Sequence, residues 1–298
     1  EHLPRLSAEM GREVFVKRDD VLGPGLGGNK TRKLEFVLGE ALASGADTIL
    51  TTGGIQSNHA RQTAAACAKL GLRCMLLLVM PPASAGRSYR TSGNLRLDRM
   101  FGADIRFLAH GTDVAEHMTA CAVEVAEAGG RPCVIPLGAA TPVGALGYAN
   151  CAAEILSQAD DRGIAGSHVV SAAGSGGTQA GLIAGFAALG ADVVCEGIDI
   201  DAERERTECR TRDLLPQTLD RLGLGGAPLP PVQVRGDFAG IAYGAPTRRG
   251  RVAIRQTARA EGIVLDAAYT GKAMAALVAG IAEGRYSAGD TIVFLHSG

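Results

Sequence analysis

A lysine stands directly behind two glycines and an asparagine, in the run Gly27-Gly28-Asn29-Lys30. An extended pattern over residues 14–20 precedes this run, and a helical pattern over residues 33–43 follows it. One interpretation is an ordinary surface lysine at a helix N-terminus. The other is a nucleophile toward an aldehyde cofactor, which requires that burial or nearby positive charge lower the pKa of the amine.

A glycine-rich turn lies in the second half of the chain, where residues 173–178 read AGSGGT. It follows an apolar run and opens a helical pattern over residues 179–189. Backbone N–H groups that converge at a strand-to-helix turn favour a phosphate group. The spacing fits neither a Walker A motif nor a GxGxxG dinucleotide motif, so a plain tight turn and a phosphate site both remain open. The candidate phosphate-binding residues are Gly174, Ser175, Gly176, Gly177 and Thr178.

Four polar residues stand in a row one position after the glycine turn of residues 53–54. They are Gln56, Ser57, Asn58 and His59. Ser57 or Asn58 could simply be the N-cap of the helical pattern that follows. A cap needs only one polar residue, however, and ligands bind at the carboxyl ends of parallel strands in α/β proteins. The run therefore favours a functional site.

Two tyrosines and one serine complete the set of candidate residues. Tyr243 and Tyr269 lie in turns beside glycines, and Ser297 directly follows an apolar run. A tyrosine in such a place is more often a packing residue. A lysine nucleophile together with a separate phosphate site indicates pyridoxal 5′-phosphate (PLP), because PLP needs an amine for its aldehyde and donors for its phosphate. A neutral hydroxyl at Ser297 would suit the pyridine nitrogen of PLP.

Short apolar runs alternate with helical patterns from Lys30 onward, which is typical of parallel strands covered on both faces by helices. We therefore predict an α/β fold with a domain boundary near residues 136–144. The Arg/Glu-rich residues 203–221 predict a solvated helix, and residues 223–231 predict a surface loop. The predicted strands are residues 47–52, 74–80, 104–108, 132–136, 168–173, 193–198 and 291–296.

The composition is that of an ordinary globular protein, with 298 residues, 46% hydrophobic residues, 20% charged residues and a net charge of −1. Such a balance predicts no general attraction to nucleic acid or to anionic membranes, and no apolar run is long enough to span a membrane. The seven cysteines are an odd number without CxxC spacing, so we expect reduced thiols and no metal site. We expect a cytoplasmic protein without a signal peptide.

Five runs in the chain resemble a known family: GGNKTRKLEF, GGIQSNHARQTAAACAKLGL, GSGGT, GALGY and DAAYTGKAMAAL. This is the D-cysteine desulfhydrase and 1-aminocyclopropane-1-carboxylate deaminase family, whose members are PLP enzymes of the tryptophan-synthase-β-like fold (fold type II). The resemblance runs in order from about Val14 to Gly298. It implies a large PLP-binding domain of residues 1–33 plus 142–298 and a smaller open α/β domain of residues 34–141, each a parallel-rich sheet flanked by helices.

The resemblance also implies how the cofactor is held. Lys30 resembles the lysine that bonds to the aldehyde of PLP, and Asn58 resembles the residue that hydrogen-bonds its phenolic oxygen. The run from Gly174 to Thr178 resembles the phosphate site. Ser297 stands where relatives have a Thr or Ser that faces the pyridine nitrogen.

On the substrate side, the resemblance assigns Ser57, Asn58 and His59 to the substrate carboxylate. Tyr243 and Tyr269 resemble the tyrosines that flank the substrate. Thr270 stands where the deaminases have Glu and agrees with the desulfhydrases. The predicted catalytic residues are Lys30, Ser57, Tyr243 and Tyr269, and the predicted substrate-binding residues are Ser57, Asn58, His59, Tyr269 and Thr270.

We therefore expect a PLP-dependent lyase that eliminates sulfide from a small amino acid such as D-cysteine, with release of pyruvate and ammonia. The base that removes the Cα proton would be Lys30 or a tyrosine near it. The alternatives are an L-cysteate sulfo-lyase, a 1-aminocyclopropane-1-carboxylate deaminase, a β-replacement synthase and a non-catalytic PLP-binding module. Because relatives are mostly homodimers, a homodimer is expected.

Overall fold

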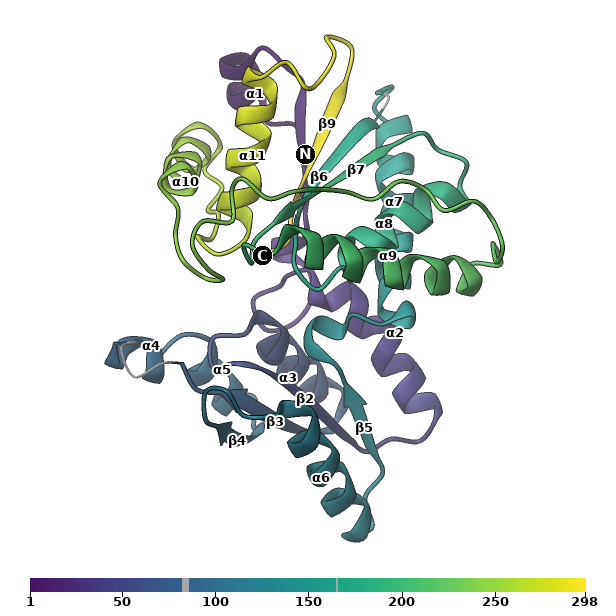
Figure 1. Cartoon of the computed structure of the whole chain (residues 1–298), viewed down its shortest axis with the longest axis vertical. Helices are drawn as coiled ribbons and strands as arrows, with labels where there is room; N and C mark the ends of the chain where they lie inside the picture. Colours follow the sequence, from purple (N-terminus) through teal and green to yellow (C-terminus); the bar gives the residue numbers. More distant parts are fainter. Residues whose placement is uncertain (82–85, 165) are drawn as a thin grey trace. The chain divides into compact units, whose positions relative to one another are not determined.

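The computed structural model describes residues 1–81, 86–164 and 166–298 (Figure 1). The chain forms two compact units, each built around a parallel sheet that helices flank. Unit 1 combines Glu1–Val21 with Ala145–Gly298, and unit 2 is continuous from Leu22 to Gly144. Residues 22–33, which we expected in the larger domain, group with unit 2, so Lys30 belongs to the smaller unit.

Unit 2 contains a four-stranded sheet in the order β4-β3-β2-β5, and every neighbouring pair is parallel. Both faces of this sheet are covered, as the alternating side chains of β3 show. Leu76 and Leu78 pack against one group of helices, and Met75 and Leu77 pack on the other side with α6. The strands are β2 (Thr48–Gly54), β3 (Arg73–Val79), β4 (Asp104–Leu108) and β5 (Pro132–Ile135). The helices are α2 (Lys30–Ala43), α3 (Asn58–Leu70), α4 (Arg87–Thr91), α5 (Asn94–Met100), α6 (Val114–Glu127) and the short 3₁₀ turn η2 (Leu137–Ala139).

Unit 1 contains a five-stranded parallel sheet in the order β1-β9-β6-β7-β8. Helices α1, α10 and α11 cover one face, and α7, α8 and α9 cover the other (Figure 1). The strands are β1 (Val14–Arg18), β6 (Gly166–Ala173), β7 (Val194–Asp199), β8 (Gln233–Arg235) and β9 (Thr291–His296). The helices are α1 (Pro4–Met10), the 3₁₀ turn η1 (Asp19–Val21), α7 (Pro142–Asp160), α8 (Gly177–Ala188), α9 (Arg204–Arg221), α10 (Arg248–Glu261) and α11 (Thr270–Ala282).

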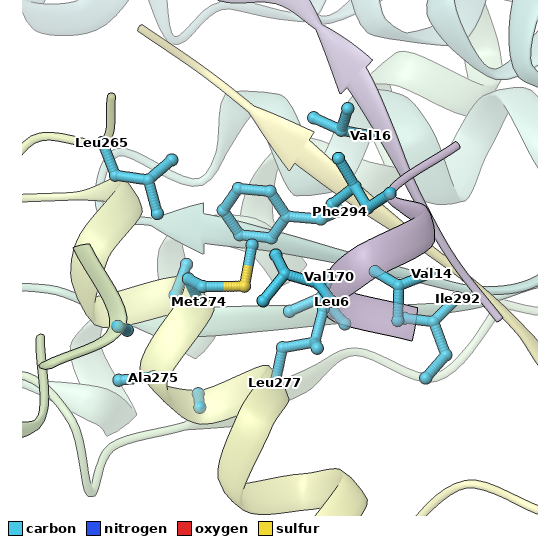
Figure 2. Close-up of a cluster of buried hydrophobic side chains, with 14 of the residues drawn as sticks. Leu6, Val14, Val16, Val170, Leu265, Met274, Ala275, Leu277, Ile292 and Phe294 are labelled. Atoms are coloured by element: carbon cyan, nitrogen blue, oxygen red, sulfur yellow. The ribbon is translucent and has the colours of Figure 1, made fainter. Parts of the chain in front are cut away.

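The core on the α11 face of unit 1 is shown in Figure 2. Phe294 of β9 and Val170 of β6 meet Met274 of α11 and Leu6 of α1, and all four side chains are at most 1% exposed. Burying a side chain of this size stabilises the fold by about 1.5–3 kcal/mol. This core fixes β9 and α11, and therefore the positions of Ser297 and Tyr269 at their ends.

The predicted α/β fold is confirmed, and each of the seven predicted strands is present to within a few residues. Two differences concern helices. Helix α2 begins at Lys30, three residues earlier than its apolar pattern indicated, and α9 is not wholly solvated. Its buried residues are Thr207, Thr211, Leu215, Thr218 and Leu219. Three of these five are threonines, which an apolar pattern does not register.

Within the described ranges, no helix has both the length and the apolar character needed to cross a membrane. The same residues hold no cluster of three or more His, Cys, Asp and Glu side chains that could bind a metal ion. The seven cysteines are free thiols, and Cys209 is the exposed one among them.

Candidate active site

Lys30 is the first residue of α2 in unit 2 and is half-buried. Its Nζ donates a hydrogen bond to Oδ1 of Asn29 at 2.8 Å. Loss of hydration lowers the pKa of the Lys30 amine from 10.5 to about 8. A much larger fraction of this amine is therefore uncharged near neutral pH than in a free lysine, as a nucleophile requires.

The turn before Lys30 is held by α3. Nη2 of Arg61 donates to the carbonyl oxygen of Gly27 at 3.2 Å, and Nη1 donates to that of Gly25. Oε1 of Gln62 accepts from the backbone N–H of Thr31 at 3.0 Å. Gly28 has φ +127°, and a Cβ there would lie 2.6 Å from Nε2 of Gln62, so only glycine fits. Arg61 and Gln62 thus fix where α2 begins.

Ser57 is the N-cap of α3, and its Oγ accepts from the backbone N–H of Ala60 at 3.1 Å. Among the described residues, Ser57 Oγ acts only as an acceptor, so its hydroxyl proton is available to a ligand. A Cβ on Gly53 would lie 2.6 Å from the Ser57 side chain, so this glycine gives the serine its room. Asn58 is half-buried, and its Oδ1 accepts from Nδ2 of Asn94 at 2.8 Å and from Nη2 of Arg61 at 3.4 Å.

His59 differs from its two neighbours, because its ring lies inside unit 2 with 3% exposure. Thr51 donates its hydroxyl proton to the Ile135 carbonyl at 2.7 Å, so its Oγ1 can only accept from His59 Nε2, at 2.8 Å. Nδ1 is then unprotonated, and it has no hydrogen-bond partner among the residues that the structure describes. Burial, aided by the charges of Lys30 and Lys33, lowers the pKa of His59 to about 3. A neutral ring turned inward does not favour the predicted contact with a substrate carboxylate.

A second lysine, Lys33, is 1% exposed one turn further along α2. Its Nζ donates to the carbonyl oxygen of Gly138 at 3.4 Å. Burial, together with the charge of Lys30, lowers the pKa of Lys33 well below that of a free lysine. The interior beside Lys30 is therefore one in which a positive charge is unfavourable.

In unit 1, the glycine turn follows β6 and opens α8, as its sequence predicts. Gly176 is the N-cap at φ +82°, and a Cβ there would lie 2.9 Å from backbone atoms of Arg210 and Thr211. Gly176 has no side chain with which to cap the helix, and the N-terminus of a helix favours a phosphate group. Nη1 of Arg210 donates to the carbonyl oxygen of Gly174 at 3.1 Å and pairs with Asp201 at 3.4 Å.

The two predicted tyrosines meet in unit 1. Their hydroxyls share a hydrogen bond, and the rings stand edge to face with centroids 5.9 Å apart. Burial raises the pKa of Tyr269 well above its usual value, and Tyr243 raises it further. Tyr243 is 56% exposed, so the pair has a solvent-facing side.

Thr270, which the sequence placed beside the substrate, is fully buried, and its hydroxyl donates to Asp266 Oδ1 at 2.7 Å. Asp266 also accepts from the backbone N–H groups of Ala268, Tyr269 and Thr270 and thereby caps α11. The hydroxyl of Thr270 is thus engaged in the cap. Ser297 lies directly after β9 and is 6% exposed.

The residues present fit PLP. Lys30 offers an amine of lowered pKa, and the uncapped N-terminus of α8 offers backbone donors to a phosphate. The close approach of Gly176 to the Arg210–Thr211 backbone leaves no room for a side chain that would cover those donors. Ser297 offers a neutral hydroxyl, as a pyridine nitrogen accepts.

Two parallel sheets flanked by helices place the chain in the fold type II class of PLP enzymes. The family described as "Pyridoxal-phosphate dependent enzyme" matches residues 1–298, and the chain belongs to this family. Its members depend on pyridoxal phosphate, and so does this chain.

The chain is similar along its whole length to curated proteins named D-cysteine desulfhydrase. It is 41% identical over 298 residues to the one from Yersinia pestis (strain Pestoides F) and 41% identical over 299 residues to the one from Salmonella typhi. Each match covers 100% of this chain and 90% of the relative. A crystal structure described as an ACC deaminase homologue superimposes with a TM-score of 0.90 at 36% identity, covering 100% of this chain and 88% of the other.

Sequence reasoning missed the residues that support Lys30 and Asn58. Arg61, Gln62 and Asn94 stood unassigned, although Arg61 and Gln62 are buried polar residues in an alanine-rich helix. Their spacing of three and four residues from Asn58 would have placed them on the same side of α3. Asn94 carries no such signal.

Proposed function

We propose that this protein is a PLP-dependent lyase that cleaves the carbon–sulfur bond of a small amino acid such as D-cysteine, with release of pyruvate, ammonia and sulfide. The observation that carries the proposal is full-length similarity, at 41% identity, to proteins named D-cysteine desulfhydrase. The lowered pKa of Lys30 supports it, because the reaction needs a reactive amine.

The residues that the resemblance assigns to PLP would hold the cofactor in this proposal. Lys30 would bond to its aldehyde, and Asn58 would donate to its phenolic oxygen. The N-terminus of α8 and residues 174–178 would bind the phosphate, and Ser297 would offer its hydroxyl to the pyridine nitrogen. PLP, when bound, withdraws electrons from the substrate Cα, so that the Cα proton and a β-substituent can leave.

In this proposal Lys30 transfers the proton, and the tyrosine pair donates a hydrogen bond. Once its amine is free, Nζ of Lys30 can take the Cα proton, because its pKa of about 8 lies close to neutral. Tyr269 stays protonated, since its pKa is raised, and shares its hydrogen bond with Tyr243. A hydroxyl that keeps its proton is suited to donate a hydrogen bond to the departing sulfur. The free hydroxyl proton of Ser57, at the N-terminus of α3, suits the substrate carboxylate.

A second candidate is a deaminase that opens 1-aminocyclopropane-1-carboxylate. The close superposition on the structure described as an ACC deaminase homologue favours it. Thr270 ranks it second, because the deaminases place Glu there, and here the side chain is fully buried in the cap of α11. We also propose a homodimer in the cytoplasm, without nucleic-acid binding, which size-exclusion chromatography with light scattering would test for the dimer.

The test is a product screen with D-cysteine, L-cysteine, cysteate, 3-chloroalanine and 1-aminocyclopropane-1-carboxylate. We expect pyruvate and sulfide from D-cysteine and little 2-oxobutyrate from the cyclopropane amino acid. Efficient release of 2-oxobutyrate would instead favour the deaminase. Cysteine formed from O-acetylserine and sulfide would indicate a β-replacement synthase. Visible absorbance of bound PLP without any product would indicate a non-catalytic module.

A further inference from the structure

Side-chain amides form a hydrogen-bonded chain in unit 2 between the 89–94 segment and the start of α3. Nε2 of Gln56 donates to the backbone carbonyl oxygens of Tyr89 at 2.7 Å and of Ser92 at 2.8 Å. Carbonyl oxygens can only accept, so the orientation of the Gln56 amide is fixed. Its Oε1 then accepts from the backbone N–H of Asn94 at 2.9 Å.

The orientation of the Asn94 side-chain amide is also fixed, and it determines that of the Asn58 amide. Its Nδ2 donates to the backbone carbonyl oxygen of Gln56 at 2.8 Å, which identifies that atom as the NH₂ group. The same Nδ2 lies 2.8 Å from the side chain of Asn58, so the Asn58 atom that faces it must be the oxygen. Nη2 of Arg61 approaches this oxygen at 3.4 Å and is likewise only a donor. Both neighbours therefore require the same orientation of the Asn58 amide.

The backbone around Asn94 is shaped for this contact. Gly93, the N-cap of α5, has φ +62°, and a Cβ there would lie 2.3 Å from Oε1 of Gln56. Only glycine allows this approach. Asn94 itself is half-buried, and it is a polar first residue in a helix that has no side-chain cap. Its amide serves the neighbouring helix and not its own.

We propose that Asn94 is a positioning residue that orients the Asn58 amide so that its NH₂ group, and not its oxygen, faces the cofactor. The inference rests on the proposed function, in which Asn58 contacts the phenolic oxygen of PLP. That oxygen carries negative charge and needs a donor. If the Asn58 amide turned over, two oxygens would face each other. The two donors that hold Oδ1 prevent this.

The experiment is a double-mutant cycle read out by equilibrium binding of PLP to the full chain, by absorbance titration. Asn94→Asp keeps the shape but replaces the donor by an acceptor, so the Asn58 amide should turn over. We expect the Kd for PLP to rise by about tenfold or more, with a shifted visible absorption maximum. Asn94→Ala should have a smaller effect, because Arg61 still holds Oδ1. In an Asn58→Ala background, either substitution should change the Kd by less than about twofold.

Asn150→Asp is the matched control, because Asn150 is an exposed amide on α7 in the other unit. The Kd of this variant for PLP should stay within about twofold of that of the unchanged chain. Far-UV circular dichroism without cofactor checks that each variant folds. If Asn94→Asp does not fold, Asn94→Ala takes its place in the double-mutant cycle. Additive effects in the double variants would overturn the inference alone. Failure of the unchanged chain to bind PLP would overturn the proposed function as well.

Discussion

The reactivity expected of Lys30 comes from its surroundings. Gly28, where only glycine fits, turns the backbone into the start of α2, and Arg61 and Gln62 hold the turn in place. The amine then lies in an interior that also disfavours charge on Lys33 and His59. Burial lowers the pKa of all three basic groups, so this is a place where a lysine loses its proton readily.

Replacing Lys30 by alanine should remove the amine to which the cofactor bonds in the proposed function. We expect turnover of D-cysteine to fall by at least about 10³-fold and the visible absorbance of lysine-bound PLP to disappear. Lys69→Ala, an exposed lysine at the end of α3, is the control and should leave both unchanged. Far-UV circular dichroism would confirm the fold. Substantial lyase activity in the Lys30 variant would contradict the assigned role.

The rate at which cofactor-free protein bonds to PLP should rise with pH around the pKa of Lys30. Only the uncharged amine attacks an aldehyde, so the rate is low where Lys30 is protonated and increases as the pH passes about 8. Stopped-flow absorbance between about pH 6 and pH 10 would measure this profile. A midpoint near 10.5, the value of a free lysine, would show that the burial of Lys30 does not lower its pKa.

At the scale of single residues, the sequence indicated Lys30, Ser57 and Asn58 from their position after glycine turns, and their roles stay predictions. It could not orient His59, because successive residues at a helix start turn by about 100° each, so a polar row cannot share one direction. Asn94 was out of reach, since its contact with Asn58 joins residues 36 positions apart. Only the packing of α5 beside α3 creates that contact.

At the scale of elements, the start of α8 is the feature on which the proposed phosphate binding depends. Its cap, Gly176, has no side chain, and a Cβ there would lie 2.9 Å from backbone atoms of α9. Arg210 of α9 donates to the carbonyl oxygen of Gly174 in the same turn. The order of elements was readable from the sequence because buried parallel strands are continuous apolar runs. The short elements α1, α4 and β8 were missed, and β8 has only three residues, too few for a pattern.

Gly176→Ala should therefore weaken PLP binding. A methyl group there would lie 2.9 Å from backbone atoms of Arg210 and Thr211, so the turn must move. Its N–H groups would then no longer point toward the phosphate. We expect the Kd for PLP to rise by about tenfold or more. Gly190→Ala, just after the other end of α8, is the matched control, because it has φ +64° but open space around it. It should cost about 1–2 kcal/mol of stability and leave the Kd unchanged.

At the scale of the whole molecule, stability should depend on pH through a buried carboxyl group in unit 2. Asp98 of α5 is fully buried, and within the described part of the chain neither of its oxygens has a hydrogen-bond partner. Burial raises the pKa of Asp98 to about 7, although the charge of Arg61 opposes this. The folded chain thus binds this proton more tightly than the unfolded chain. Asp98 therefore makes the fold less stable as the pH rises from about 4 to about 7.

Asp98→Asn removes this charge while keeping the shape of the protonated acid. We expect the midpoint of thermal unfolding to rise relative to the unchanged chain, and to rise more at pH 8 than at pH 5. Asp104→Asn, an exposed carboxylate on β4 of the same unit, should change the midpoint little at either pH. An equal effect of Asp98→Asn at both pH values would show that Asp98 is charged throughout, against its raised pKa.

The pairing of β1 with β9 has a consequence for how the protein is made. These strands come from opposite ends of the sequence, yet Val14 stands in register with Ile292 and Arg18 with His296. The sheet of unit 1 therefore cannot close on a ribosome until the last strand has emerged, whereas unit 2 is a continuous segment between the two parts of unit 1. During synthesis β1 lacks its partner strand β9, and unit 2 is the part of the chain that can fold first.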